Sequence, residues 1–168
     1  MLRLRPLRPG DEAAFRAGHE QMAAEGFVFG FLLEPETPWD EYLRTQADWR
    51  CGQNLPDGWV PNTFLVADVG GQLVGRVSIR HELTDFLREE GGHIGYGVLP
   101  PFRRRGYATE ILRHALVIAR SVGVDRVLVT CDDDNVGSIR TIEACGGKLD
   151  SVRPAEPASV ALRRYWID

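Results

Sequence analysis

Three consecutive arginines followed by a glycine, Arg103 to Gly106, have the clearest chemical potential in this sequence. They lie between a short apolar run that ends at Pro100 and Pro101 and a helix-like pattern that begins near Ala108. The first turn of a helix leaves backbone N–H groups unpaired and carries about half a positive charge, so it binds phosphate readily. Gly106 has no Cβ to keep a phosphate away from the backbone. This turn is therefore expected to bind a ligand that carries several phosphates.

Other kinds of phosphate site fit the sequence less well. A P-loop needs a lysine after its glycines, and the one lysine of the chain is Lys148. A dinucleotide fingerprint fails because Gly95 and Gly97 are followed by Pro100 where a third glycine is needed. A solvated charge run or a nucleic-acid patch at Arg103 to Arg105 remains an alternative. The chain has 24 Asp+Glu against 20 Lys+Arg and a pI near 5.6, so no broad basic field supports nucleic-acid binding.

The apolar pattern predicts the elements that position this turn. A strand is expected over 93–98, a long amphipathic helix from 108 to about 122, and a strand over 126–130. Upstream, two strands at 63–69 and 72–83 are joined by two glycines, 70 and 71, which suit a tight hairpin turn. The segment 84–92 is expected to be a charged loop.

The two ends of the chain are expected to add strands and helices to these elements. A strand is predicted at 2–7, and Asp11 is expected to cap a helix that runs toward Gly26. A second helix is predicted to start at Thr37 and Pro38. Strands at 148–152 and 160–167, around a loop that contains proline, complete the predicted order.

Arg103, Gly106 and Ala108 match the signature Arg/Gln-x-x-Gly-x-Gly/Ala, and a second signature begins at Asn135. With its strands and helices in this order, the region 63–152 resembles the GNAT acetyltransferase superfamily. The closing segment 163–167 and the run 130–135 are similar to those of a subgroup of predicted bacterial acetyltransferases whose substrate is unassigned. The resemblance implies a mixed α/β fold, with a mostly antiparallel central sheet of about seven strands flanked by helices on both faces.

The same resemblance implies acetyl-CoA as co-substrate and no metal. Its pyrophosphate would lie on the backbone amides of the turn, and its pantetheine arm along the strand that ends near Val98, where Gly95 and Gly97 suit a bulge. The implied cofactor-binding residues are Val98, Arg103, Arg104, Arg105, Gly106, Tyr107, Ala108, Thr109, Asn135 and Ser138.

Two residues of the strand at 93–98 are candidate catalytic residues. His93 occupies the position where many members of the superfamily carry a glutamate that acts as general base through water, and histidine titrates near neutral pH. The alternative is a surface histidine that begins a strand. Tyr96 is the second candidate, although an aromatic residue there is more often part of a pocket wall.

The usual general acid of the superfamily is missing. Many members carry a tyrosine in the helix after Asn135 that protonates the departing thiolate, and here that position is Ile142. Cys145 and Tyr165 are conceivable substitutes, and solvent is another. The run Asp132 to Asn135 lacks the glycine and glutamate spacing of a calcium loop, so capping of a helix is its plain structural interpretation.

The acceptor pocket is predicted between Phe27 and Trp49 and the closing strands. Aromatic side chains gather there beside carboxylates, and this combination attracts cationic amines. The alternative is that the aromatic residues are core and the acids a solvated helix face. The residues concerned are Phe27, Phe29, Phe31, Trp39, Tyr42 and Trp49, with Glu34, Glu36, Asp40 and Glu41.

Length and composition indicate one acyl-CoA N-acyltransferase domain over residues 1–168. No apolar stretch is long enough to cross a bilayer, and the N-terminus lacks a signal-like apolar core. Three widely spaced cysteines are typical of reduced thiols in a cytoplasmic protein. The function expected is transfer of acetyl from acetyl-CoA to a primary amine of a small molecule or peptide, by direct attack within a ternary complex. A non-catalytic CoA-binding or sensory module is the alternative, and a homodimer is left open.

Overall fold

The computed structural model describes residues 1–155 and 160–168. Its seven strands form a four-stranded sheet in the order β1-β2-β3-β4 and a three-stranded sheet in the order β5-β7-β6, and every ladder is antiparallel. This confirms the expected mixed fold with a mostly antiparallel sheet. The strands are β1 (Leu2–Arg5), β2 (Asn62–Val69), β3 (Gln72–Arg80), β4 (Ile94–Val98), β5 (Val127–Asp132), β6 (Lys148–Arg153) and β7 (Leu162–Ile167).

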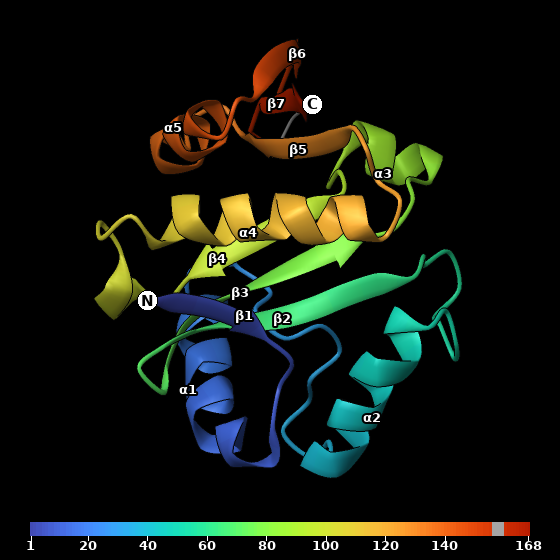
Figure 1. Ribbon diagram of the computed structural model, residues 1–168, viewed down its shortest axis with the longest axis vertical. Helices are drawn as coiled ribbons and strands as arrows, with labels where there is room; N and C mark the ends of the chain where they lie inside the picture. The colour runs from blue at the N-terminus through green and yellow to red at the C-terminus, as the bar shows by residue number, and fades with distance from the viewer. Residues whose placement is uncertain (156–159) are drawn as a thin grey trace.

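Helices cover both faces of the four-stranded sheet (Figure 1). α4 crosses one face, and α1 and α2 cover the other. The sequence alternation of β2 explains this, because Leu65 and Ala67 pack toward α4 while Phe64 and Val66 pack into the cluster of α1 and α2. The helices are α1 (Glu12–Ala23), α2 (Trp39–Arg50), α3 (Asp85–Glu89), α4 (Tyr107–Ser121) and α5 (Val136–Ala144), with 3₁₀ turns at Pro9–Asp11 and Pro100–Phe102. Among the described residues, no helix is long and apolar enough to span a membrane.

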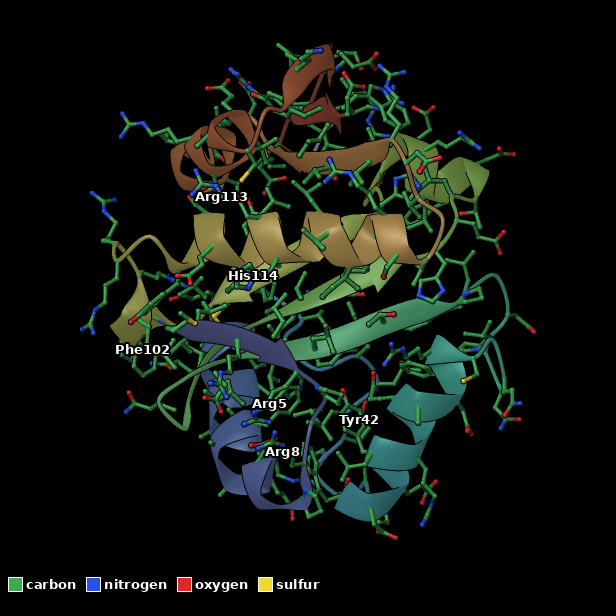
Figure 2. The ribbon with its side chains drawn as sticks, viewed as in Figure 1. Arg5, Arg8, Tyr42, Phe102, Arg113 and His114 are labelled. Atoms are coloured by element: carbon green, nitrogen blue, oxygen red, sulfur yellow. The ribbon has the colours of Figure 1, made fainter. Side chains whose placement is uncertain are left out.

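The structure corrects several local predictions. The segment 84–92, predicted as loop, contains α3, whose first turn is capped by the Thr84 hydroxyl. Asp11 precedes α1, but its carboxylate accepts hydrogen bonds from the Arg8 backbone N–H and the Arg5 guanidinium instead of capping the helix. Figure 2 shows Arg5 between β1 and the start of α1, where it also pairs with Asp68 of β2. The predicted loop between the last two strands lies partly outside the described residues.

The hairpin between β2 and β3 forms as predicted, with positive φ angles at Gly70 and Gly71. The bulge predicted in β4 is wrong, because β3 and β4 pair in unbroken register and the register shift lies in β2, between Ala67 and Asp68. Gly97 serves a different purpose: a Cβ there would stand 2.7 Å from the ring of Phe27. The absent side chain therefore makes room for a neighbouring segment.

The two sheets are joined at the start of β4. The His93 backbone N–H donates to the carbonyl of Leu128 (2.7 Å), and the Leu128 N–H donates to His93 Nδ1 (2.9 Å). Nearby, the Gly91 N–H donates to the Thr130 hydroxyl (3.2 Å). β4 and β5 belong to different sheets, and no strand ladder joins them. A gap between these two strands follows directly from the topology.

Gly92 makes the junction sterically feasible. Its φ is +60°, and a Cβ built on it would lie 2.5 Å from the carbonyl oxygen of Leu128. We expect Gly92→Ala to lower the free energy of unfolding by more than about 1 kcal/mol, because it adds a backbone clash to left-handed strain. Gly123→Ala is the matched control, since its φ is +89° and nothing lies within 4 Å of its Cβ position. Urea unfolding of both variants measures the difference, and equal losses would contradict a role for the close approach.

His93 is expected to make stability depend on pH. Burial, with a smaller contribution from Arg88 and Arg80, lowers the pKa of His93 to about 4, below its usual value near 6.5. The unfolded chain therefore binds a proton more readily, and stability present above pH 6.5 is lost as the pH falls toward 4. His93→Asn keeps an acceptor for the Leu128 N–H but does not titrate. Between pH 7 and pH 4.5, the free energy of unfolding in urea should fall by at least about 1 kcal/mol more in the wild type than in His93→Asn. Equal losses in the two proteins would show that another group carries the pH dependence.

Candidate active site

A cleft of about 650 Å³ opens where β4 and β5 separate. Its walls come from the end of β4, the turn before α4, the start of α5 and the segment that follows α1. The structure brings most of the predicted site residues to this cleft. They are Tyr96, Val98, Arg103, Arg104, Gly106, Tyr107, Ala108, Thr109, Asn135 and Ser138.

The N-terminus of α4 faces the cleft with unpaired donors. Gly106 is the N-cap, in a left-handed conformation at φ +81°, and nothing lies within 4 Å of the place a Cβ would take. The first N–H in this turn to reach an intrahelical acceptor is that of Glu110, which donates to the Gly106 carbonyl (3.2 Å). The three preceding N–H groups, of residues 107–109, are therefore available to an anion. The geometry has the features that the sequence predicted for a phosphate site.

The three arginines of the turn have different surroundings. Arg103 is an anchor: its Nε donates to the Val98 carbonyl (3.0 Å), and its Nη2 pairs with Glu25 at 2.6 Å. Arg104 lines the cleft with its backbone at φ +65°. Arg105 does not line the cleft, and its guanidinium lies 5.9 Å from the centre of the Phe102 ring. Of the three, Arg104 is the one that lies on the cleft without a salt bridge to any described residue.

Tyr96 lies at the inner end of the cleft with its hydroxyl buried. The hydroxyl has no hydrogen-bond partner of good geometry among the described residues, although Ser138 and Thr141 lie close enough to affect its titration. Burial raises the pKa of Tyr96 to about 12. At neutral pH the group is therefore a protonated phenol that can donate to a ligand in the cleft.

The other candidate acids and bases lie elsewhere. His93 is not among the residues that line the cleft, and its Nδ1 lone pair accepts from Leu128, so this geometry does not support a general base at His93. Ile142 is fully buried in the core. The Tyr165 hydroxyl is held by Glu143 (3.2 Å) and Arg163 (3.3 Å), away from the cleft. Cys145 has its pKa raised by burial, and its thiol faces the Thr109 carbonyl (3.7 Å).

A second hollow, of about 350 Å³, lies beside the first and shares part of its wall. The shared residues are Phe27, Tyr96, Asp132, Asn135 and Ser138. Cys131 also lines this hollow, and burial raises the pKa of its thiol to about 11, so it is a poor nucleophile at neutral pH. A ligand in either hollow would therefore be able to contact Tyr96.

The residues predicted to build the acceptor pocket do not lie together. Phe27 and Phe31 line the second hollow, but Trp39, Tyr42 and Trp49 are core residues. Figure 2 shows Tyr42 between α1 and α2, beneath the sheet. The four carboxylates at positions 34, 36, 40 and 41 line neither hollow. The charged residues that do line the second hollow are Arg76, Arg80 and Asp132, so the expected acidic lining is wrong.

Sequence reasoning missed the contribution of β3 and of the α1 end. Arg76 and Arg80 stand four residues apart on β3, which places both side chains on one face of the sheet, toward the second hollow. The four-residue spacing could have predicted two arginines on one face of the sheet. The apolar residues around Arg76 instead suggested a strand of the hydrophobic core. Met22 and Glu25 also line the cleft. Both contact Arg103, which is distant from them in the sequence.

Comparison with known proteins agrees with this geometry. The family model described as "Acetyltransferase (GNAT) domain" matches residues 1–148. No curated protein matches the sequence.

Solved structures share the fold at low sequence identity. A GNAT-family acetyltransferase from Streptococcus pneumoniae is 18% identical with a TM-score of 0.67, and the match covers 99% of each chain. RimJ from Mycobacterium smegmatis, in complex with CoA-disulfide, is 20% identical with a TM-score of 0.69, covering 99% of this chain and 81% of that one. The microcin C7 self-immunity acetyltransferase MccE, in complex with acetyl-CoA and AMP, is 17% identical with a TM-score of 0.68, covering 99% and 91%.

The family model matches most of the chain, and the cleft between β4 and β5 opens beside the predicted phosphate-binding turn. This protein therefore belongs to the GNAT acetyltransferase family.

Proposed function

We propose that the protein transfers the acetyl group of acetyl-CoA to a primary amine, with the acetyl donor in the cleft and the amine in the second hollow. The observation that carries this proposal is the shared wall of the two hollows, in which Tyr96 faces both. Two substrates that enter from opposite sides can therefore meet at one point. The complexes of RimJ with CoA-disulfide and of MccE with acetyl-CoA support the choice of donor.

The donor's pyrophosphate fits the turn before α4. Residues 107–109 offer backbone N–H groups, Gly106 leaves room for close approach, and Arg104 adds a positive charge at the surface. Asn135 and Ser138 are proposed to hold the arm of the donor near the reacting carbonyl. The Asn135 side chain also caps α5 by accepting from the Ser138 N–H (3.0 Å), which keeps both residues in place.

The reaction is proposed to proceed by direct attack. The amine nitrogen forms a bond to the thioester carbon, the carbon–sulfur bond breaks, and the departing sulfur takes a proton from the Tyr96 hydroxyl. The proton that the amine nitrogen loses as the amide forms returns to the Tyr96 oxygen through solvent, which restores the phenol. Tyr96 suits this role because it lines the cleft as a protonated phenol at neutral pH, and its hydroxyl has no competing partner of good geometry among the described residues. The raised pKa of Cys131, the cysteine on the second hollow, argues against a covalent acetyl-cysteine step. The cytoplasmic location predicted above goes with this proposal, because CoA thioesters are supplied there.

The turn before α4 can be tested by blocking it. Gly106→Leu should abolish the thermal stabilisation by acetyl-CoA, because a side chain on Gly106 would stand between the phosphates and the helix N-terminus. A donor at a hundred times its Kd should stabilise the wild type by about 2.7 kcal/mol. Gly123→Leu is the control, since it introduces similar backbone strain at the other end of α4 with open space around it. A full thermal shift in the Gly106 variant would place the donor elsewhere.

The proton donor can be tested with a pair of tyrosine variants. Tyr96→Phe should lower kcat by about tenfold or more while leaving the acetyl-CoA affinity unchanged, because only the transferable proton is removed. Tyr165→Phe, whose hydroxyl lies away from the cleft, should keep its turnover. Thiol release from acetyl-CoA with a panel of amines measures both variants. Unchanged turnover of Tyr96→Phe would remove Tyr96 from the mechanism, and CoA binding without turnover on any amine by the wild type would favour a non-catalytic module.

A further inference from the structure

Two arginines of the second hollow have no acidic partner in the described part of the chain. Arg76 is only 3% exposed, and its guanidinium donates to the carbonyls of Phe29 (3.1 Å), Gly95 (3.0 Å) and Val28. The Nη1 of Arg80 donates to the carbonyls of Gly91 and Gly92 (3.1 Å each). Within residues 1–155 and 160–168, neither arginine forms an ion pair with a carboxylate.

This arrangement leaves both positive charges without a carboxylate, although the Arg76 guanidinium also lies over the rings of Phe27 (4.6 Å) and Phe31 (5.0 Å), and it leaves hydrogen-bond donors of Arg80 unused. Burial lowers the pKa of both groups, and no carboxylate of the described residues pairs with them to offset the cost. An arginine has five N–H donors, and only Nη1 of Arg80 is engaged by the residues described, so its Nε and Nη2 remain available. A buried charge is normally paired with an opposite charge. Two arginines that lack a carboxylate partner and line a hollow therefore indicate an anionic ligand.

Gly95 marks the space where the two guanidinium groups converge. A Cβ at Gly95 would stand 3.7 Å from Nη1 of Arg76 and 3.9 Å from Nη1 of Arg80. Because glycine occupies this place, the surface before both arginines is open to the hollow. A carboxylate or phosphate there would be within reach of fixed, partly desolvated positive charge.

A third hollow, of about 390 Å³, continues from the second through Phe31 and Arg80, which line both. Its apolar wall includes Trp59, whose ring meets Phe31 edge-on at 5.8 Å, and Phe86, which is 65% exposed. Asn62 also lines it: this side chain is 4% exposed, and its Oδ1 has no hydrogen-bond partner among the described residues. An aromatic wall with an unpaired acceptor is typical of a small-molecule site.

We propose that the acceptor is a small amine that also carries an anionic group and an apolar, aromatic-sized body. The anionic group binds before Gly95, between Arg76 and Arg80. The apolar body lies among Phe31, Trp59 and Phe86, and the amine points to the wall shared with the donor cleft. This assignment rests on the proposed function, since it identifies the class of acceptor for that reaction.

The acidic residues around the hollows do not neutralise this site. Asp132 lies on the wall shared with the donor cleft, and Asp57 lies on the third hollow; both are exposed, whereas Arg76 is buried. Asp132 is placed where it could meet the ammonium form of the amine. The two hollows together have the size of a single small-molecule site, which favours a free metabolite-sized amine over a folded protein surface.

The anion site can be tested by binding, without any turnover. In CoA-saturated protein, 3-phenylpropionate should bind at least tenfold more tightly than its neutral analogue 3-phenylpropionamide, as measured by titration calorimetry. Arg80→Gln should remove this preference, and Arg44→Gln, which changes an exposed arginine of α2, should retain it. Phenyl phosphate, titrated in parallel, decides whether a carboxylate or a phosphate is preferred.

A second variant covers the case in which Arg80→Gln does not fold. Gly95→Ala adds a methyl group at ordinary contact distance from both arginines, so it should fold and yet weaken 3-phenylpropionate binding about tenfold. Equal affinity for the acid and the amide in the wild type, or undiminished acid binding in both variants, would overturn the anion site.

Turnover then separates this inference from the proposed function. With acetyl-CoA, phenylalanine should be acetylated with a kcat/KM at least tenfold above that of phenylethylamine, which lacks the carboxylate. The reverse order would overturn the anionic acceptor while leaving acetyl transfer intact. Arg80-dependent binding of 3-phenylpropionate with no acetylation of either amine would count against the proposed function and leave the anion site standing.

Discussion

The contact between His93 and Leu128 is the constraint on which the rest of the site depends. Two hydrogen bonds join the sheets there, and Gly92 allows the backbones to approach. A ladder between β4 and β5 would close the gap, and the structure has none. β4 and β5 therefore each keep one edge without a strand partner along the cleft. The fold thus holds together at one end of the strands and binds ligands at the other.

Charge is used differently on the two sides of this gap. On the donor side, Arg103 is neutralised by Glu25 and braces the turn against α1, so the backbone N–H groups of α4 remain the main anion site. On the acceptor side, Arg76 and Arg80 are braced by carbonyl groups, and within the described residues their charge stays unneutralised. Carbonyl groups, and for Arg76 also the rings of Phe27 and Phe31, orient these guanidinium groups without supplying the negative charge of a carboxylate. Arg103, which is paired with a carboxylate, therefore has a structural role, whereas Arg76 and Arg80, which are not, are proposed to bind a ligand.

The proposed proton donor lies on a different element from the one that the resemblance implied. That helix position is Ile142, which is fully buried in the core. Tyr96 reaches the same cleft from β4, across from Ser138 and Thr141 of that helix. A phenol in the cleft is protonated at neutral pH, so its position beside the reacting sulfur is the condition that matters. The absence of a tyrosine at position 142 is therefore weak evidence against catalysis, because β4 lines the same cleft and carries Tyr96.

The sequence by itself determined the features that depend on neighbours along the chain. The glycine turn between β2 and β3, the cap of α5 by Asn135 and the open first turn of α4 all follow from residues a few positions apart. Local patterns also placed most strands, although α3 was missed because its five residues carry no clear period. Tertiary structure decided what depends on distant residues. The sequence made His93 a candidate general base, and only the fold shows that its Nδ1 accepts a hydrogen bond from Leu128. Trp39, Tyr42 and Trp49 are core residues because α2 packs on the sheet. The surroundings of Arg76 and Arg80 could not be predicted from the sequence, because the segment after α1 holds Arg76 and the glycines before β4 hold Arg80, with no carboxylate from the described residues. Burial and pairing are properties of the folded chain.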